Sequence, residues 1–425
     1  MADQLVPSKS VGGVATSRGP LWPLLASLLP ATTAMYCLYQ AIQTVLIPAQ
    51  VEAIDPANKV GNLALLTTMT AVATLLALPL GGAISDRTSG RFGRRSPWLA
   101  VTAVLSALLT ALMGSLDTVL LLGFVYALVF FASNFYQAAL TAILPDRVPE
   151  SRRGIASSVL GLGTPLGILV GVNFAARVQP ELAYIGIGVF LVAATMVLLV
   201  VSPEGPYERR PRTMREGGKG ARLSVASEFF GAFTSRNFTL AFASRFLLFL
   251  SYFVISGYLF YTLQDHIGVE NLPGHSPAIA VATVSTIQTF AWILVAGIAG
   301  FLADKLDRRK LFVAVCSVGM GLAMLVPILV PTWSGMLVYA VLSGAFFGTY
   351  MSVDLALMSL VLPDGESEGR DMGILAVATA APTLFSSAIA GALITYAGGY
   401  VTLFAFGSVV AIVAGIAVVP IRGIK

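Results

Sequence analysis

GGAISDRTSGRFGRRSPW, residues 81–98, joins two long apolar segments and holds four arginines within the nine positions from Arg87 to Arg95. Around this loop the 425-residue chain is 56% hydrophobic and only 11% charged, with a mean hydropathy of +0.84. A soluble chain of this length would need more charge to cover its surface. Apolar runs of about twenty residues recur throughout, each long enough to cross a bilayer core about 30 Å thick. The composition predicts an all-α polytopic membrane protein without a cleavable signal peptide.

Twelve transmembrane helices are predicted, in two six-helix halves. We expect an N-terminal half over residues 1–201, a basic cytoplasmic linker over 202–237 and a C-terminal half over 238–425. Within the linker, residues 224–233 predict either a short amphipathic helix on the membrane surface or a plain tether. The predicted spans are 21–47, 61–84, 97–114, 118–143, 152–175, 182–201, 238–264, 277–302, 310–330, 333–362, 370–396 and 398–421.

The 26 Lys and Arg residues are distributed unevenly between the two sides of these spans. If both termini are cytoplasmic, the inner segments hold 23 of them, the outer loops hold only Lys59 and Arg177, and Arg245 lies within a span. Cytoplasmic loops of membrane proteins carry such an excess of positive charge. We therefore expect both termini in the cytoplasm and the protein in the plasma (inner) membrane. Arginines in the loop at 81–98 would help to fix this topology and would meet anionic lipid headgroups.

The two halves contain an internal repeat. GAISDR (82–87) aligns with GFLADK (300–305) at an offset of 218 positions, and the same offset places LPD (144–146) onto LPD (362–364). Two matches at one offset indicate a duplication rather than chance. Two six-span halves in the same orientation, related by an axis along the membrane normal, are an architecture for alternating access. The repeat therefore favours a transporter.

These loops also resemble those of a known family. GFLADKLDRRK (300–310) resembles the signature loop of the major facilitator superfamily, and the twelve spans, central linker and duplication extend the resemblance over nearly the whole chain. The first-half copy is longer, because residues 88–92 are inserted before GRRSPW (93–98). This longer form, together with LPDRVPESRRG (144–154), is similar to the glycoside–pentoside–hexuronide cation symporters and the related sucrose transporters.

The resemblance implies a role for the charged loop residues. In this superfamily the loop aspartate faces the N-terminus of a helix from the other half, and the arginines pair with neighbouring acids. Such a contact can break when the transporter changes state. We therefore expect a cytoplasmic gating loop, with topology and lipid contact alone as the alternative. Its expected members are Asp86, Arg87, Arg94 and Arg95, with Asp304 and Arg308 as their second-half counterparts.

Two ionisable residues lie well inside predicted spans, Arg245 in the seventh and Asp354 in the tenth. Intramembrane charges are costly and by default indicate function. At 1.5 Å per residue, both lie roughly 10–12 Å from the cytoplasmic boundary. The resemblance implies that spans one, four, seven and ten line the central cavity. We expect Arg245 and Asp354 to form a salt bridge in one state, coupled to proton or substrate binding; a static buried pair is the alternative.

Polar residues recur at helical spacing along several spans. Amides donate and accept hydrogen bonds at once, and aromatic faces stack on the C–H faces of sugar rings. Such a set suits a neutral, polyhydroxylated substrate better than a strong anion, although the same residue types also join helices to one another in lipid. The candidate substrate-binding residues are Tyr36, Gln40, Gln43, Asn134, Gln137, Ser285, Gln288, Trp292 and Tyr350.

Together these features predict a secondary active transporter, a monomer among membrane lipids that moves a small molecule and binds no nucleic acid. Our interpretation is proton-coupled symport of a sugar or glycoside. A proton-driven exporter of drugs or small metabolites is the alternative, and a membrane enzyme or sensor is a remote one.

The coupling ion is predicted from the family resemblance. Sodium-dependent members of the resembled family cluster carboxylates on spans two and four, whereas residues 61–84 and 118–143 contain none away from their edges. This leaves protons, or no coupling at all. His266 and His275 share one loop without further ligands nearby, so we expect no metal and no cofactor other than the coupling proton.

Overall fold

The computed structural model describes residues 21–207, 233, 235–306, 308–361 and 368–421. Within these residues, twelve spans are long and apolar enough to cross a membrane, as predicted. The first half contains α1 (Leu21–Ala41), α2 (Ile47–Ile54), α3 (Lys59–Arg87), α4 (Ser96–Met113), α5 (Val119–Arg147), α6 (Arg153–Ala175) and α7 (Pro180–Val201). The second half contains α9 (Arg236–Ser256), α10 (Leu259–Tyr261), α11 (Pro277–Leu306), α12 (Arg309–Leu329), α13 (Trp333–Val361), α14 (Glu368–Tyr396) and α15 (Tyr400–Val418).

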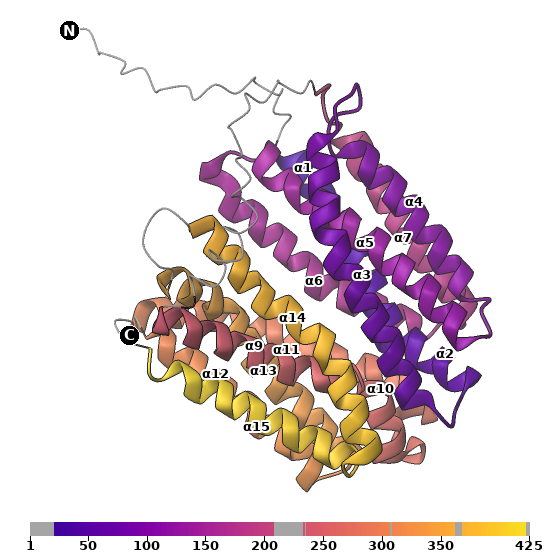
Figure 1. Ribbon diagram of the computed structural model, residues 1–425, viewed down its shortest axis with the longest axis vertical. Helices are drawn as coiled ribbons and strands as arrows, with labels where there is room; N and C mark the ends of the chain where they lie inside the picture. The colour runs from indigo at the N-terminus through magenta and orange to yellow at the C-terminus, as the bar shows by residue number, and fades with distance from the viewer. Residues whose placement is uncertain (1–20, 208–232, 234, 307, 362–367, 422–425) are drawn as a thin grey trace, which may run out of the picture.

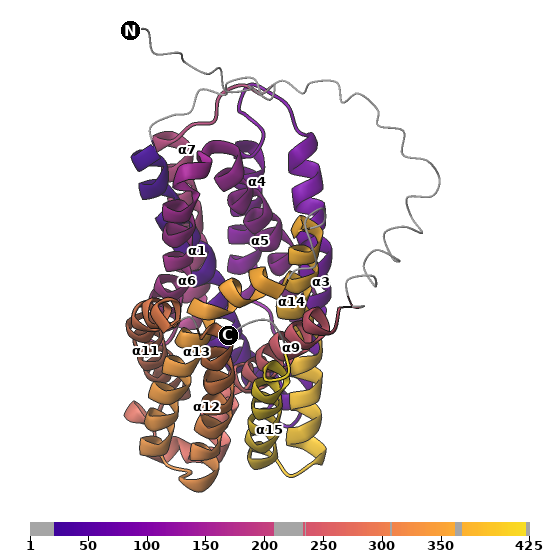
Figure 2. The same ribbon diagram turned by 90° about the vertical axis from the view of Figure 1, so that its left-hand side faces the viewer.

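Each half forms a helical bundle (Figures 1 and 2). In the first, α1 packs against α6 and α7, and α5 packs against α3 and α4. In the second, α9 packs against α14 and α15, while α12 and α11 pack against α13. The bundles meet along α3 and α14 and along α6 and α11. We call the end where α7 finishes and α9 begins the linker end, and the end where α2 meets α10 the opposite end.

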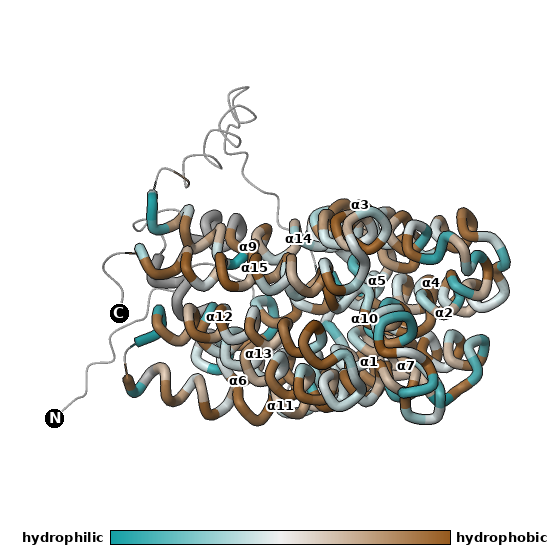
Figure 3. Tube along the Cα trace, turned by 90° about the horizontal axis from the view of Figure 1, so that it is seen from below, coloured by the Kyte–Doolittle hydropathy of each residue, from teal (hydrophilic) through white to brown (hydrophobic). Residues whose placement is uncertain are grey.

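The outer surface of the bundles is apolar. Leu120, Leu294 and Phe301 are 73%, 68% and 70% exposed, and many other large hydrophobic side chains face outward. Figure 3 shows hydrophobic residues running along the helices, with hydrophilic residues at several helix ends and loops. An apolar surface of this extent would be unfavourable in water but matches the hydrocarbon core of a bilayer. The chain is therefore an integral, multi-pass membrane protein.

Two spans differ most from the predicted ranges, because their helices are irregular. The first continues beyond 47, through a π-helical turn over Ile42–Leu46, to Ile54 at the end of α2. Pro48 explains the turn, because a proline ring clashes with the carbonyl group four residues earlier in a regular α-helix and a wider turn relieves the clash. The seventh span was predicted as 238–264, but α9 ends at Ser256. A break at Gly257, the short α10 and a second π-helical turn over Thr262–Gly268 follow it.

Local sequence explains several helix ends. Pro180 occupies the first position of α7, where its missing N–H costs nothing. The Ser235 hydroxyl accepts a hydrogen bond from the Phe238 N–H at the start of α9. Between α14 and α15 the chain turns through Gly398 and Gly399, whose φ angles of +105° and +78° favour glycine. These ends bring α14 and α15 back along the second bundle.

Candidate functional site

A cavity of about 390 Å³ lies at the boundary between the two bundles. Its walls come from α1, α3 and α5 of the first half and from α9 and α14 of the second. Gln43 reaches it from the π-helical turn, a type of turn that is frequent at functional sites. Five of the predicted substrate-binding residues line this cavity, namely Tyr36, Gln40, Gln43, Asn134 and Gln137.

A second, smaller cavity of about 70 Å³ adjoins the first and shares Gln40 and Gln43 with it. Three further predicted residues, Ser285, Gln288 and Trp292, reach it from α11. The structure therefore gathers residues that lie far apart in the sequence around one polar space between the halves.

Tyr350 is the one predicted substrate-binding residue that lines neither cavity. It is 1% exposed on α13, one helical turn before Asp354, and its ring centroid lies 6.1 Å from that of Phe249. Tyr350 lies at helical spacing from Ser343 and Asp354, but its turn of α13 packs against α9 and does not face either cavity. Tyr350 thus belongs to the surroundings of Asp354.

The amides around the cavities are held by hydrogen bonds within the protein. The Asn134 amide nitrogen donates to the Phe130 carbonyl oxygen at 2.7 Å and to the Thr74 hydroxyl at 3.1 Å. The Gln288 amide nitrogen donates to the Ser343 hydroxyl at 2.8 Å, and the Tyr39 hydroxyl donates to Gln137 Oε1 at 3.5 Å. These contacts orient the amides before a ligand arrives, which lowers the entropic cost of binding.

Hydroxyl groups form two further walls of the larger cavity that were not predicted. They lie on α3 and α14, the second and eleventh spans, whereas the family resemblance pointed to spans one, four, seven and ten. Their spacing of three, four and seven residues was visible in the sequence, but nothing in the sequence showed which helix face meets the other half. The residues are Thr67, Thr70 and Thr74 on α3, and Thr379, Thr383, Ser386 and Ser387 on α14.

Charge is excluded from these walls. Among the described residues that line the two cavities, none is ionised at neutral pH. The lining combines amide, hydroxyl and aromatic groups, which can bind hydroxyl-rich molecules through hydrogen bonds and ring stacking. A volume of about 390 Å³ also falls within the range of ligand pockets, about 300–1,000 Å³.

Arg245 and Asp354 form an ion pair beside the larger cavity. Arg245 Nη1 lies 2.6 Å from Asp354 Oδ2, and the side chains are 14% and 2% exposed. The Arg245 guanidinium lies 5.8 Å from the Phe249 ring centroid, and its Nε donates a hydrogen bond of 2.8 Å to the hydroxyl of Thr379 in the cavity wall. The structure thus places the two expected intramembrane charges together and connects them to the cavity.

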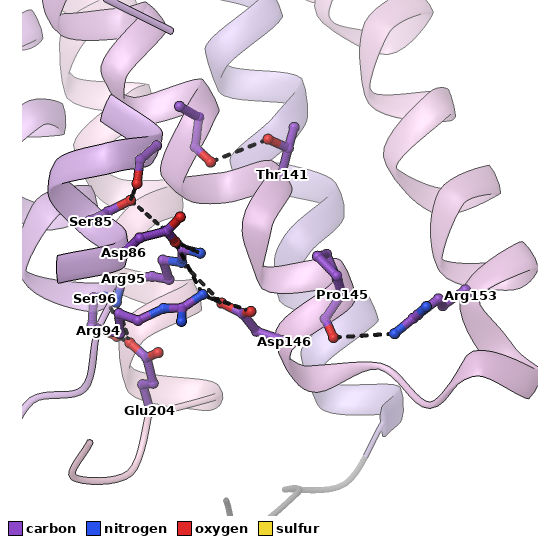
Figure 4. Close-up of polar contacts among 12 residues, drawn as sticks. Ser85, Asp86, Arg94, Arg95, Ser96, Thr141, Pro145, Asp146, Arg153 and Glu204 are labelled. Carbon is purple, nitrogen blue, oxygen red and sulfur yellow. Dashed lines mark hydrogen bonds and ion pairs between the residues drawn. The ribbon is translucent and has the colours of Figure 1, made fainter. Parts of the chain in front are cut away.

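The loop at 81–98 forms a charged network at the linker end (Figure 4). Arg94 Nη2 lies 2.9 Å from Asp146, and Arg95 Nε lies 3.0 Å from the same carboxylate. Asp86 Oδ1 contacts Arg95 Nη2 at 2.5 Å and Arg94 Nη2 at 3.2 Å. All four residues belong to the first half. In this structure the described contacts of Asp86 are therefore with its own half, not with a helix of the other.

Glu204, which follows α7, completes this network. Its Oε2 accepts hydrogen bonds from the backbone N–H groups of Arg95 at 2.7 Å and Ser96 at 2.9 Å, so that a carboxylate caps the N-terminus of α4. Partial burial lowers the pKa of Arg94, but attraction to Asp146, Tyr207 and Asp86 outweighs it and raises that pKa above its usual value. Neither Asp146 nor Glu204 was among the residues expected to form the gating loop.

The structure describes no ion pair for the other residues expected in the gating loop, Arg87, Arg308 and Asp304. Arg87 is exposed at the end of α3, and Arg308 is exposed at the residue before α12. The backbone of Asp304 lies in the last turn of α11, but its side chain lies outside the described part of the structure. Their proposed gating roles stay predictions.

At the opposite end, a polar cluster joins the two halves directly. Lys59 Nζ lies 3.0 Å from Glu52 of its own half and 2.8 Å from Asp265 of the other. The Tyr400 hydroxyl donates to Asp265 at 2.6 Å, and the Tyr261 hydroxyl donates to the Pro48 carbonyl oxygen of the first half at 2.9 Å. Gln264 also donates to Glu52 across the boundary. We call this set of contacts the interhalf clamp.

Twelve apolar spans in the described part of the chain, arranged in two bundles with a polar cavity at their boundary, form the architecture of a secondary transporter. Residues 28–287 and 241–423 match the family model described as Major Facilitator Superfamily, and the chain belongs to this family. Membership indicates a transport protein rather than an enzyme.

Curated relatives are distant and longer than the matched region. The chain is 26% identical over 269 residues to "MFS transporter asaE" of Aspergillus flavus, covering 63% of this chain and 57% of that protein. It is 27% identical over 233 residues to "General alpha-glucoside permease" of Schizosaccharomyces pombe, covering 48% of this chain and 41% of that protein. The chain therefore spans only about half the length of these relatives.

Solved structures agree with the fold. A peptide transporter POT in complex with sulfate superposes with a TM-score of 0.73 at 14% identity, covering 96% of each chain. A bacterial homologue of the human lysosomal transporter Spinster, in an inward-facing and occupied conformation, superposes with a TM-score of 0.60 at 16% identity, covering 93% of this chain and 94% of that one. At these identities the similarity concerns the fold alone.

Proposed function

We propose that this protein imports a neutral sugar or glycoside together with protons by alternating access. The observation that carries the proposal is an uncharged cavity of amide, hydroxyl and aromatic groups with a buried Arg245–Asp354 ion pair beside it. The cavity supplies the chemistry for a polyhydroxylated ligand, and the ion pair supplies a carboxylate for a proton. The similarity to a protein named as an alpha-glucoside permease supports a glycoside as the first ligand class to test.

The structure corresponds, in this proposal, to an inward-facing state. The interhalf clamp joins the bundles at the opposite end, near α2 and α10. The helices of the two halves spread apart from there toward the linker end (Figure 1). The excess of Lys and Arg favours a cytoplasmic linker, and with that orientation the clamp would close the outer face.

The coupling step follows from the chemistry of the pair. When Asp354 is ionised, Arg245 holds it in a neutral ion pair. When a proton binds Asp354, the attraction between the two side chains is lost and Arg245 is free to move. A substrate that binds next to Arg245 favours one of these arrangements over the other, and this difference in binding energy is what couples proton and substrate.

The proposal is tested first by thermal unfolding of the purified protein in detergent with methyl α-D-glucoside, maltose, sucrose, amphipathic cationic drugs and small organic anions. A ligand at one hundred times its dissociation constant stabilises the native state by about 2.7 kcal/mol. We expect a higher Tm with one sugar class. A higher Tm with the cationic drugs alone would refute the sugar proposal and indicate an exporter.

Transport is then measured in proteoliposomes with an imposed pH gradient. We expect uptake of the stabilising sugar to rise with the gradient in the wild type and to lose its pH dependence in Asp354→Asn. Uptake in Asp354→Asn that follows pH as in the wild type would show that the coupling proton binds elsewhere.

A further inference from the structure

Thr379 belongs both to the cavity wall and to the surroundings of the ion pair. It lies on α14, where its neighbour one turn later, Thr383, also lines the larger cavity. Its hydroxyl accepts the 2.8 Å hydrogen bond from Arg245 Nε. Thr383 differs, because its hydroxyl donates to the Ala380 carbonyl oxygen of its own helix at 2.7 Å. Thr379 therefore lines the larger cavity and also contacts Arg245 directly.

The hydroxyl of Thr379 fixes the orientation of the guanidinium. Arg245 Nη1 points to Asp354 at 2.6 Å while Nε is held by Thr379, and the planar guanidinium makes these two directions rigidly dependent on each other. A flexible arginine side chain gains specificity when two of its donors are fixed at once. If the Thr379 contact is lost, the position of Nη1 against the carboxylate is no longer determined by two anchors.

We propose that Thr379 is the positioning residue through which occupancy of the cavity is communicated to the Arg245–Asp354 pair. A substrate hydroxyl in the larger cavity competes with Arg245 for the Thr379 oxygen. The guanidinium then loses its second anchor, its hold on Asp354 weakens, and the carboxylate accepts a proton more readily. This inference rests on the proposed function and identifies the residue that performs its coupling step.

Among the residues whose side chains the structure describes, few other groups near the pair can titrate. The pair itself consists of Arg245 on α9 and Asp354 on α13. Tyr350 of α13 lies next to Asp354, and Cys316 of α12 lies near Tyr350. Phe249 and Thr379 do not ionise in the accessible pH range. Neither Tyr350 nor Cys316 ordinarily ionises below pH 8. A pH dependence that is present in the wild type and absent in Asp354→Asn therefore reports on Asp354 and its contact with Arg245, and not on His266 or His275 elsewhere in the chain.

The test compares Thr379→Val, Thr379→Ser and the control Thr383→Val in the full chain, with methyl α-D-glucoside as the probe. Uptake into proteoliposomes is measured against pH, with KM and maximal rate determined separately. We expect Thr379→Val to move the pH of half-maximal uptake upward by about one unit, the effect of losing a hydrogen bond to a charged group. Thr379→Ser retains the hydroxyl and should keep the wild-type midpoint. Thr383→Val should raise KM and leave the midpoint in place.

The inference is overturned if Thr379→Val raises KM as Thr383→Val does while the pH midpoint stays unchanged, because Thr379 would then only bind substrate. If the wild type takes up no glucoside, the proposed substrate is wrong, and a measurement without substrate decides the inference. The Tm of each variant is followed against pH in detergent. A pH-dependent change in Tm that is absent in Asp354→Asn and displaced in Thr379→Val would support the link. An identical profile in wild type and Thr379→Val would refute it.

Discussion

At the scale of single residues, Asp354 depends on its arginine for charge compensation. Its side chain is 2% exposed and Oδ2 contacts Arg245. Oδ1 makes no hydrogen bond of ordinary geometry in the described part of the chain. Removing one partner of a buried ion pair leaves an uncompensated charge and costs about 3–5 kcal/mol, whereas replacing both with apolar residues of similar volume is often neutral.

We therefore expect Arg245→Leu to lower the stability in detergent by about 3–5 kcal/mol, and the double variant Arg245→Leu with Asp354→Leu to recover most of the loss. Unfolding followed by tryptophan fluorescence at pH 7 measures both. Equal losses in the single and the double variant would mean that the pair contributes no electrostatic compensation.

Glu204 gives a second prediction at this scale. Its carboxylate caps α4 through two backbone N–H groups, and loss of such a cap costs about 0.5–2 kcal/mol. We expect Glu204→Ala to lower the free energy of unfolding by this amount and Glu204→Gln, which keeps an acceptor oxygen, by less. Glu181→Ala, in the first turn of α7, is the control and should have a smaller effect.

These residues differ in how far the sequence alone identifies them. Arg245 and Asp354 were found because a charge inside an apolar span is conspicuous and has few explanations. Glu204 could not be found in that way, because its hydrogen-bond partners lie 109 and 108 positions away in the sequence. Its role depends on how the end of α7 meets the start of α4, which is a property of the folded bundle.

At the scale of elements, close helix contacts shape the smaller cavity. Gly348 of α13 lies against α11, and a methyl group at this position would be 2.7 Å from the Trp292 carbonyl oxygen and 2.8 Å from its Cα atom. Trp292 lines that cavity and packs against Phe347 at 5.4 Å. The absence of a side chain at Gly348 therefore positions a predicted substrate-binding residue.

We expect Gly348→Ala to cost about 1–3 kcal/mol through overpacking and to weaken ligand binding by displacing α11. Gly297→Ala is the matched control on α11, because nothing lies within 4 Å of the added methyl group. Thermal unfolding with and without ligand tests both variants. Stability and ligand response that remain unchanged in Gly348→Ala would show that α11 shifts at no cost.

The helices themselves were largely predictable, since long apolar runs bounded by charges and turns have few other solutions in a membrane. The sequence did not predict where the helices are irregular or which helix faces line the cavity. The π-helical turn at Ile42–Leu46 moves Gln43 into both cavities, and the break at Gly257 ends α9 eight residues before the predicted limit of 264. The hydroxyl walls on α3 and α14 were missed because only packing between the halves decides which face lines the cavity.

At the scale of the whole molecule, the interhalf clamp stabilises one arrangement of the two bundles. Lys59, Glu52 and Asp265 are 14%, 25% and 31% exposed, so their ion pairs are partly screened. Pairs of this kind contribute about 0.2–1 kcal/mol each. Losing them should shift the population toward the state that is open at this end, without unfolding either bundle.

We expect Lys59→Met to raise the labelling rate of Ser256→Cys by a membrane-impermeant maleimide, applied from the opposite end, by about fivefold, which corresponds to about 1 kcal/mol. Ser256 lines both cavities. The native Cys37 and Cys316 are buried and provide the background. Lys59→Arg keeps the charge and should label as slowly as the unmodified clamp. Equal rates in Lys59→Met and Lys59→Arg would show that the clamp does not hold this end closed.

The two halves have diverged in chemistry although their loops still repeat. Asp354 lies eight positions before the second LPD, and Tyr136 lies eight positions before the first. Tyr136 is fully buried, and its hydroxyl lies 2.9 Å from that of Thr195. A neutral pair of hydroxyls in one half thus corresponds to the position of a carboxylate in the other.

The Arg245–Asp354 ion pair determines how the protein would respond to voltage in the proposed cycle. While Asp354 is ionised, the pair with Arg245 has no net charge, so an electrical potential does almost no work on it as the halves move. A proton on Asp354 leaves one positive charge inside the membrane, and a full elementary charge crossing the potential is worth about 2.3 kcal/mol per 100 mV. The membrane potential would therefore drive the loaded protein inward, and the empty protein would return without opposing it.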